Sequence, residues 1–236
     1  MVEINGVSWK VSVLPSLGHI RSVLSFPPRY YQKRIQKIGF TGKNTRLLDA
    51  ACGAGIWAIG ASYYNRNVEA IDATEKYLAV AKDINAQLKR KNLKIKRGKL
   101  ENLPYPDNYF DYIICYDAWM YTQRAKSLRE MARVLKSGGK IYLGCIAGLG
   151  WYLSLIVQGL IRGDRGLILL ALGAMKNRVF MAKKTSLYFL AKEHFQVLGF
   201  GSDGQIGDPK IKIKPVYPPK FLGFWRVYEI LAEKIK

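Results

Sequence analysis

The segment from Arg46 to Ala58 constrains the fold of this chain more than any other. It reads Arg-Leu-Leu-Asp-Ala-Ala-Cys-Gly-Ala-Gly-Ile-Trp-Ala. The two leucines are typical of a buried strand, while Gly53 and Gly55 allow a sharp turn and a close approach of the backbone to a ligand. Helical spacing then begins at Ile56. The segment therefore predicts a strand, a glycine loop and a helix in succession.

An acidic residue follows the next predicted strand, which covers residues 67–71. This residue is Asp72, 19 positions after Gly53. A glycine loop places unpaired backbone N–H groups at a helix N-terminus, and ligands of open α/β sheets bind beyond the carboxyl ends of the strands. An acid at this offset suits hydrogen bonds to ribose hydroxyls. The pattern indicates a nucleoside-containing cofactor.

Two cofactor classes fit the glycine loop, because residues 53–58 also match the G-x-G-x-x-A form of the dinucleotide fingerprint. Asp49 decides between them. A carboxylate between the strand and the first glycine would repel a pyrophosphate, whereas it can accept a hydrogen bond from an ammonium group and favour a sulfonium. We therefore expect S-adenosylmethionine rather than NAD.

Four sequence blocks extend this pattern and carry a family resemblance. In order and spacing the chain resembles the class I S-adenosylmethionine-dependent methyltransferases, and within them the branch that contains the quinone-ring methyltransferases. The resemblance covers residues 40–145 and leaves the flanks unassigned. The blocks are Leu48 to Gly55, Ala70 to Leu78, Glu101 to Asp111 and Met131 to Lys140.

The resemblance implies an α/β, Rossmann-like fold: a mostly parallel seven-stranded sheet with helices on both faces and an antiparallel hairpin at its end. The length of 236 residues suits a single domain. Within it we expect an N-terminal cover segment (1–40) with a helix over 29–38, an apolar lid insertion (146–180) and a C-terminal helix (217–236). The terminal hairpin is predicted on strands 200–206 and 210–215, around a turn at 207–209.

The resemblance also implies a set of site residues. Asp49, Gly53 and Gly55 would hold the methionine part of the cofactor, Asp72 the ribose, and Leu100 with Glu101 the adenine. Lys99 departs from the family, because relatives usually have an acid there that accepts a hydrogen bond from the adenine amino group, and a lysine cannot accept one. The full set of cofactor-binding candidates is Asp49, Ala51, Gly53, Gly55, Asp72, Ala73, Leu100, Glu101 and Tyr116.

The predicted fourth strand covers residues 111–116, and in the family the end of this strand faces the transferred methyl group. The substrate candidates are therefore Trp119 and Tyr121, joined by Trp151 from the lid. Asp117 is a candidate general base, which methyl transfer requires only when the acceptor is protonated, because alignment and desolvation supply most of the rate. The alternative is that Asp117 caps the next helix.

The charge of the chain points to an anionic partner. Lys and Arg number 38 against 17 acids, a formal net charge of +21, and residues 89–99 carry seven positive charges with no acid. Such an excess suits RNA, an acidic membrane surface or an acidic protein. The alternative is a solvated basic surface.

The segment from Ile141 to Ile161 runs 21 residues without a charge. Its first part belongs to the predicted fifth strand and it contains several glycines, so a pair of helices, 151–162 and 167–177, is favoured over a membrane span. So apolar a pair should cover a hydrophobic substrate or lie in a membrane interface, unless it is buried against the core or a second copy. We expect a lipophilic small-molecule substrate, a quinone or isoprenoid-like lipid. An RNA methyltransferase and a non-catalytic binding protein on the same scaffold are the alternatives.

The remaining features indicate a reduced, cytoplasmic protein, with peripheral contact to an anionic membrane as an option. Cys52, Cys115 and Cys145 have no C-x-x-C spacing and suit small core residues. The two histidines lie far apart without a cluster of ligands, so no metal is expected. The first residues lack the charged start and apolar run of a signal peptide.

Overall fold

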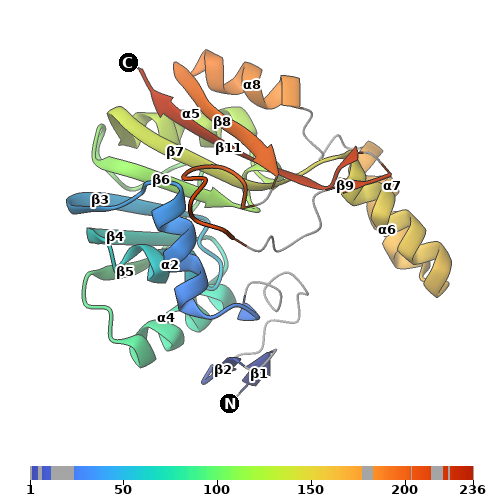
Figure 1. Ribbon diagram of the computed structural model, residues 1–236, viewed down its shortest axis with the longest axis horizontal. Coiled ribbons are helices and arrows are strands. Elements are labelled where there is room, and N and C mark those ends of the chain that lie inside the picture. Colours follow the sequence, from blue (N-terminus) through green and yellow to red (C-terminus); the bar gives the residue numbers. More distant parts are fainter. Residues whose placement is uncertain are drawn as a thin grey trace.

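The computed structural model describes residues 2–4, 7–11, 24–176, 183–202, 204–213, 220–222 and 224–235. Its centre is a seven-stranded sheet with the order β5-β4-β3-β6-β7-β11-β8 (Figure 1). Neighbours are parallel from β5 through β7, and β11 is antiparallel to both β7 and β8. The predicted fold class is confirmed. The strands are β3 (Gly42–Ala50), β4 (Asn65–Asp72), β5 (Leu93–Arg97), β6 (Phe110–Tyr116), β7 (Leu135–Ala147), β8 (Phe195–Ser202) and β11 (Val227–Lys234).

Helices cover both faces of this sheet. Successive strand residues point to opposite faces, so Leu47 and Leu48 of β3 enter two different hydrophobic cores. The first core is completed by α2, α3 and α4, and the second by α5 and α8. The three predicted core cysteines are buried, as expected. The helices are α2 (Pro28–Lys37), α3 (Ile56–Ala61), α4 (Glu75–Leu88), the 3₁₀ helix η1 (Trp119–Tyr121), α5 (Arg124–Val134) and α8 (Lys183–Lys192).

The N-terminal part forms a small hairpin and then the helix α2. Strands β1 (Val2–Ile4) and β2 (Val7–Trp9) pair with each other, and the following Lys10 exchanges two hydrogen bonds with Gln87 at the end of α4. The predicted helix over 29–38 is confirmed as α2, which packs against α3. At Gly60 of α3, an added Cβ would lie 2.8 Å from the Cβ of Tyr31.

The prediction of a C-terminal helix over 217–236 is wrong. Residues 227–234 form β11, which lies between β7 and β8 and is buried along most of its length. A strand that is covered on both faces needs no alternation of polar and apolar residues. Its apolar run therefore matched helical spacing equally well, and only the strand pairing distinguishes the two.

The prediction of the terminal hairpin placed its strands on the wrong residues. The antiparallel end of the sheet is built from β8 and β11 instead of 200–206 and 210–215. Residues 204–213 pack against α2, where Asp208 N donates to Lys37 O at 2.7 Å. Lys37 Nζ in turn donates to the carbonyls of Asp208 and Ile211 at 2.8 Å. Residues 214 and 215 lie outside the described residues.

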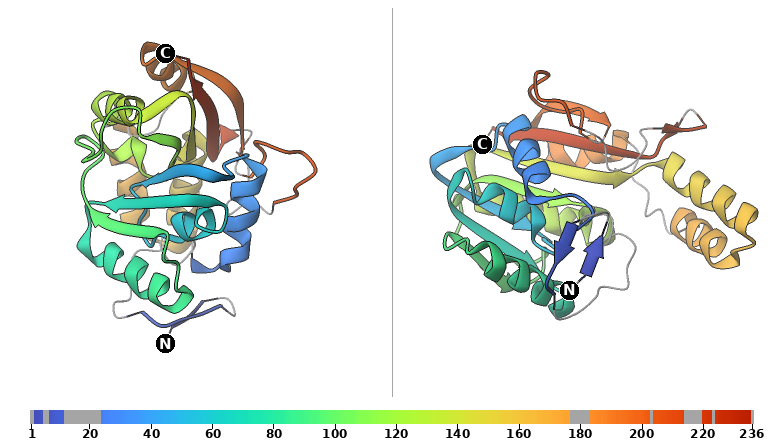
Figure 2. Two further views of the ribbon diagram at one scale, coloured as in Figure 1. Left: turned by 90° about the vertical axis from the view of Figure 1, so that its left-hand side faces the viewer. Right: turned by 60° about the horizontal axis from the view of Figure 1, so that its bottom comes forward.

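The two predicted apolar helices are present as α6 (Leu149–Arg162) and α7 (Arg165–Lys176). They form a hairpin that projects away from the body of the molecule (Figure 2). Two short strands, β9 (Lys220–Phe221) and β10 (Phe224–Trp225), pair with each other and lie beside α6. Across the described part of the chain, no helix combines the length and the apolar character that crossing a membrane requires.

Candidate cofactor site

The glycine loop after β3 turns in the left-handed region of backbone conformation. Ala51, Gly53 and Gly55 have φ values of 63°, 52° and 71°. Two effects exclude a side chain at Gly55. The left-handed backbone disfavours a Cβ, and an added Cβ would lie 2.8 Å from the Cβ of Ala81 on α4. Ala51 adopts the same conformation although it carries a Cβ, and residues with a Cβ rarely do so. The two glycines favour this turn, whereas Ala51 is held in a conformation that its own side chain disfavours.

Asp49 lies buried beneath this loop, at the N-terminus of α3. Its Oδ2 accepts a hydrogen bond from Ala58 N at 2.9 Å. The pKa of the Asp49 carboxyl is raised to about 7, mainly by burial; the hydrogen bond from Ala58 N opposes this rise and the charge of Asp72 contributes to it. A buried carboxylate with a raised pKa gains from a cation placed beside it. This is the environment that an ammonium or sulfonium group requires.

Asp72 ends β4 and faces the loop from the other side. Its Oδ2 accepts from Gly53 N at 2.9 Å and its Oδ1 accepts from Thr74 N at 2.8 Å. Each carboxylate oxygen retains acceptor capacity for a hydroxyl. Thr74 occupies the N-cap position of α4, but its side chain makes no capping bond.

A pocket of about 490 Å³ opens beside Asp72, within the size range of small-molecule sites. Five of the predicted cofactor residues line it, namely Ala51, Asp72, Ala73, Leu100 and Glu101. The sequence did not predict the opposite wall, where Glu101 Oε1 accepts a hydrogen bond from Gln123 N at 3.1 Å. The signal for that wall was the short connection between β6 and α5, since ligands of such sheets bind beyond the carboxyl ends of the strands. The other lining residues are Gly98, Lys99, Asn102, Thr122, Gln123 and Lys126.

The residues present fit a nucleoside that carries a cationic group. Asp72 offers carboxylate oxygens at the pocket wall, and Asp49 offers a buried carboxylate on the other side of the glycine loop. The adenine end lacks the family acid, since the exposed Lys99 lines the pocket there. Asp49, Gly53, Gly55 and Tyr116 do not themselves line this pocket. Their assignment to the cofactor stays a prediction.

Asp117, the predicted base, follows β6 in a left-handed conformation with φ of 54°. Its N–H donates to Gly144 O at 2.9 Å. The N-cap positions of the next two helices are Ala118 and Gln123, so Asp117 does not occupy the capping position of either. Burial and, second to it, the charge of Asp117 raise the pKa of Tyr152 to about 12. The structure therefore places Asp117 near the base of α6, outside the wall of the pocket.

The three predicted substrate contacts lie in different environments. Trp119 is buried, and its Nε1 donates to Arg124 O at 2.9 Å, so it is a core residue and not the predicted substrate contact. Tyr121 is 63% exposed. Trp151 is half-buried at the start of α6, with the Arg226 guanidinium 5.3 Å from its ring centroid. Trp119 and Tyr121 lie in η1, whereas Trp151 comes from α6 and packs against the same hydrophobic core as Trp119.

A buried charged network next to Tyr116 was also missed. Arg34 of α2 donates from Nη2 to Tyr142 OH of β7 at 2.7 Å and forms an ion pair with Glu229 of β11. The guanidinium lies 4.7 Å from the ring centroid of Trp57 and 5.3 Å from that of Tyr116. Because its members lie 108 and 195 positions from Arg34, no local pattern could reveal the network.

Comparisons with known proteins agree with this geometry. A family model described as "Methyltransferase domain" matches residues 48–143. The uncharacterized methyltransferase YcgJ of Bacillus subtilis is 37% identical over 99 residues, which cover 42% of this chain and 39% of YcgJ. The demethylmenaquinone methyltransferase of Listeria monocytogenes is 32% identical over 149 residues, 61% of each chain. The chain thus spans less than two thirds of the length of these curated relatives.

Solved structures share the fold over most of the chain. The crystal structure of Bacillus YcgJ superimposes with a TM-score of 0.61 at 18% identity, covering 88% of this chain and 99% of that one. A geranyl diphosphate methyltransferase in complex with S-adenosylmethionine gives 0.63 at 14% identity, covering 93% and 92%. Residues 48–143 thus match a methyltransferase domain, and the chain shares the fold of these solved structures.

Proposed function

We propose that this protein binds S-adenosylmethionine and transfers its methyl group to a lipophilic small molecule. The observation that carries the proposal is the pair of carboxylates, Asp49 and Asp72, held on either side of a left-handed glycine loop next to a pocket of about 490 Å³. Two carboxylates in such different environments suit the two ends of one ligand, a cationic amino acid part and a ribose.

The bound cofactor would supply a methyl group on a cationic sulfonium. Asp72 accepts the ribose hydroxyls with the acceptor capacity that Gly53 N and Thr74 N leave free. Asp49 lies beside the cationic end, and burial strengthens its attraction for that charge. Glu101, held by Gln123 N, completes the adenine side. Asp117 would take up a proton only if the group that receives the methyl carries one.

Two observations support a lipophilic acceptor. The apolar hairpin of α6 and α7 begins two residues after β7 ends, on the side of the sheet where the parallel strands end. The relative from Listeria named above acts, by its name, on demethylmenaquinone, a quinone. Tyr121 and Trp151 remain the proposed contacts for such an acceptor.

RNA is the second candidate for the acceptor. The basic run over residues 89–99 includes the edge strand β5, whose Lys94 and Arg97 are exposed, and its last residue, Lys99, lines the pocket. A basic edge that leads to the pocket would suit a phosphate backbone. RNA binding would then weaken steeply with added salt. Lys99 also motivates the third alternative, a binding protein without activity.

The test is calorimetric titration with S-adenosylmethionine, followed by transfer of a radiolabelled methyl group. We expect binding to the wild type, at least tenfold weaker binding to Asp72→Asn, and unchanged binding to Glu75→Gln. Glu75 is a matched control because it starts α4 without lining the pocket. Melting curves of the variants report whether the loop stays folded.

The destination of the label separates the alternatives. Label in an organic extract of a lipid mixture supports the lipophilic acceptor, and label in RNA supports the second candidate. Binding without transfer to either favours the binding protein. Absence of binding to the folded wild type would overturn the proposal and identify Lys99 as the mark of a lost site.

A further inference from the structure

The end of the projecting α6–α7 hairpin is exposed and apolar. All residues of the turn region from Leu160 to Gly166 are exposed; we call this segment the hairpin tip. The exposed fractions reach 67% for Leu160 and 79% for Ile161. Monomeric soluble proteins rarely expose contiguous apolar surface of this kind without a partner. The adjoining helix α7 adds Leu169, Leu170 and Leu172, all exposed.

A second element lies beside α6 and adds to this surface. The β9–β10 pair contacts α6 and carries Leu222, 69% exposed in its turn, and Phe224, 49% exposed. Of the twelve large apolar residues that are exposed in the described part of the chain, seven lie on these two elements. The clustering distinguishes this surface from the scattered apolar exposure found on any protein.

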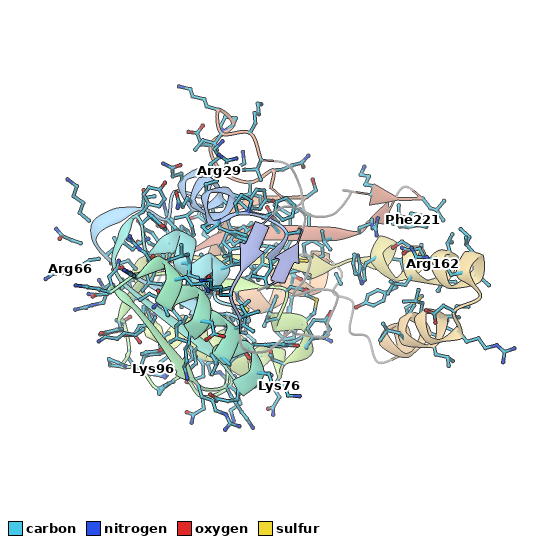
Figure 3. The ribbon with its side chains drawn as sticks, turned by 90° about the horizontal axis from the view of Figure 1, so that it is seen from below. Arg29, Arg66, Lys76, Lys96, Arg162 and Phe221 are labelled. Carbon is cyan, nitrogen blue, oxygen red and sulfur yellow. The ribbon has the colours of Figure 1, made fainter. Side chains whose placement is uncertain are left out.

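The charges at the hairpin tip are predominantly positive. Arg162 and Arg165 are exposed on either side of the turn, and Figure 3 shows Arg162 on the hairpin, with Phe221 of β9 nearby. The acid between them, Asp164, accepts hydrogen bonds through Oδ1 from Gly166 N and Leu167 N at the start of α7. Asp164 therefore serves to cap the helix, and the two arginines determine which partner the tip attracts.

The hairpin is formed before any partner arrives. Gly159 lets α6 and α7 approach closely, since an added Cβ would lie 2.6 Å from Ile168 Cγ1. At the base of α6, Tyr152 and Ser154 are buried. Docking of a preformed tip costs little conformational entropy.

We propose that the hairpin tip docks into the interface of a bilayer that contains anionic phospholipids. Leucine and isoleucine side chains at the end of a projection can enter the acyl boundary, while the flanking arginines remain at the level of the phosphates. The net charge of +21 adds attraction for the same surface. Because no described helix can span a bilayer, this contact is interfacial. The inference does not depend on the proposed methyl transfer.

Vesicle co-sedimentation tests this docking with the full chain. We expect binding to vesicles of phosphatidylcholine with phosphatidylglycerol and much weaker binding to phosphatidylcholine alone. The double variant Leu160→Ser/Ile161→Ser should lose at least about tenfold in affinity for the anionic vesicles, because it removes two apolar side chains from the contact. Arg162→Gln/Arg165→Gln should lose the preference for anionic lipid. Leu198→Ser/Ile235→Ser, exposed apolar positions away from the hairpin, is the matched control and should bind as the wild type does.

A probe at the tip separates insertion from simple charge attraction. The native cysteines are all buried, so a thiol-reactive NBD dye on Ile161→Cys reports this position alone. Insertion predicts a blue shift and a rise in fluorescence with anionic vesicles, and neither with soluble RNA.

Three results would overturn the proposal. One is failure of the wild type to bind anionic vesicles. Another is binding that the Leu160→Ser/Ile161→Ser variant retains in full, which would assign it to the basic surface as a whole. The third is a dimer, seen by sedimentation velocity, that this same variant dissociates, because a second copy would then cover the tip.

Discussion

At the scale of single residues, the environment decides what each acid of the site can do. Asp49 is buried and its pKa is raised to about 7, mainly by burial. Asp72 is also buried, but its two oxygens each accept a backbone N–H. Glu229, a third buried acid, is paired with Arg34. The three carboxylates therefore differ in function because their partners differ, and two of them lead to predictions.

The raised pKa of Asp49 predicts proton release on cofactor binding. Below pH 7 the carboxyl is mostly protonated, and a cationic ligand favours the carboxylate and lowers its pKa. At pH 6.5 binding should release a proton, and affinity should fall by up to about tenfold per pH unit below pH 7. Calorimetry in two buffers with different ionisation enthalpies measures the release.

Asp49→Asn is the control for this assignment, since it should abolish the proton release while Glu75→Gln leaves it unchanged. The same pKa has a consequence for the protein without ligand. Because the unfolded state loses this proton first, the free energy of unfolding should decrease as pH rises from about 4 to about 7. Proton release that persists in Asp49→Asn would assign it to another group.

The buried pair of Arg34 and Glu229 predicts a large loss of stability when one partner is removed. Glu229→Ala leaves a buried guanidinium without its counter-ion, which costs about 3–5 kcal/mol. Asp107→Ala removes an exposed partner of Arg133 and should cost about 1 kcal/mol or less. Urea unfolding of both variants measures the difference. Equal losses would contradict the view that burial decides the strength of this pair.

At the scale of elements, the glycine loop joins β3 to α3 and contacts α4 through Gly55. Gly55 is important for both the turn and the packing. Its backbone is left-handed, and Ala81 lies close to where a Cβ at Gly55 would be. The loop explains why α3 can begin directly beside the ligand site. Its geometry can be tested by separating backbone strain from steric contact.

Two glycine substitutions separate these effects. Gly39 and Gly55 have φ values of 74° and 71°, but only at Gly55 would an added Cβ meet a neighbour. Gly39→Ala should cost about 1–2 kcal/mol of backbone strain, and Gly55→Ala a further 1–3 kcal/mol, roughly, from overpacking. We expect cofactor binding to be lost only in Gly55→Ala. Denaturant unfolding and calorimetry check both, and similar behaviour of the two variants would argue against the contact with Ala81.

At the scale of the whole molecule, the two ends of the chain join the body of the protein in different ways. The C-terminal strand β11 lies between β7 and β8, so the sheet is complete only after the last residues are in place. The N-terminal hairpin, in contrast, joins the body through the exposed contact of Lys10 with Gln87. The two ends should therefore differ in their importance for folding.

Deletion of each end tests this difference. Removing residues 227–236 deprives both β7 and β8 of a hydrogen-bonded neighbour, and we expect an insoluble protein or one without a cooperative thermal transition. Removing residues 1–11 should leave the transition cooperative, with a shift of a few degrees. Circular dichroism follows both. A cooperative, native-like spectrum of the C-terminal deletion would contradict the central position of β11.

The sequence by itself determined the fold class, the glycine loop, the positions of the two acids beside it and the pair of apolar helices. These features rest on local signals, since a strand, a turn and a helix each have a periodicity that neighbouring residues carry. Five pocket residues, among them Asp72 and Glu101, followed from these signals and the family resemblance. The opposite pocket wall at Gln123 did not.

Only the tertiary structure decided the features that depend on distant partners. The C-terminal segment is a strand because β7 and β8 surround it, and a residue run that is buried on both faces carries no alternation to distinguish it from a helix. Trp119 is a core residue because α5 and α8 cover it. Arg34 meets Glu229 across 195 positions of sequence. Pairing and burial of this kind are properties of the assembled sheet, and no local pattern records them.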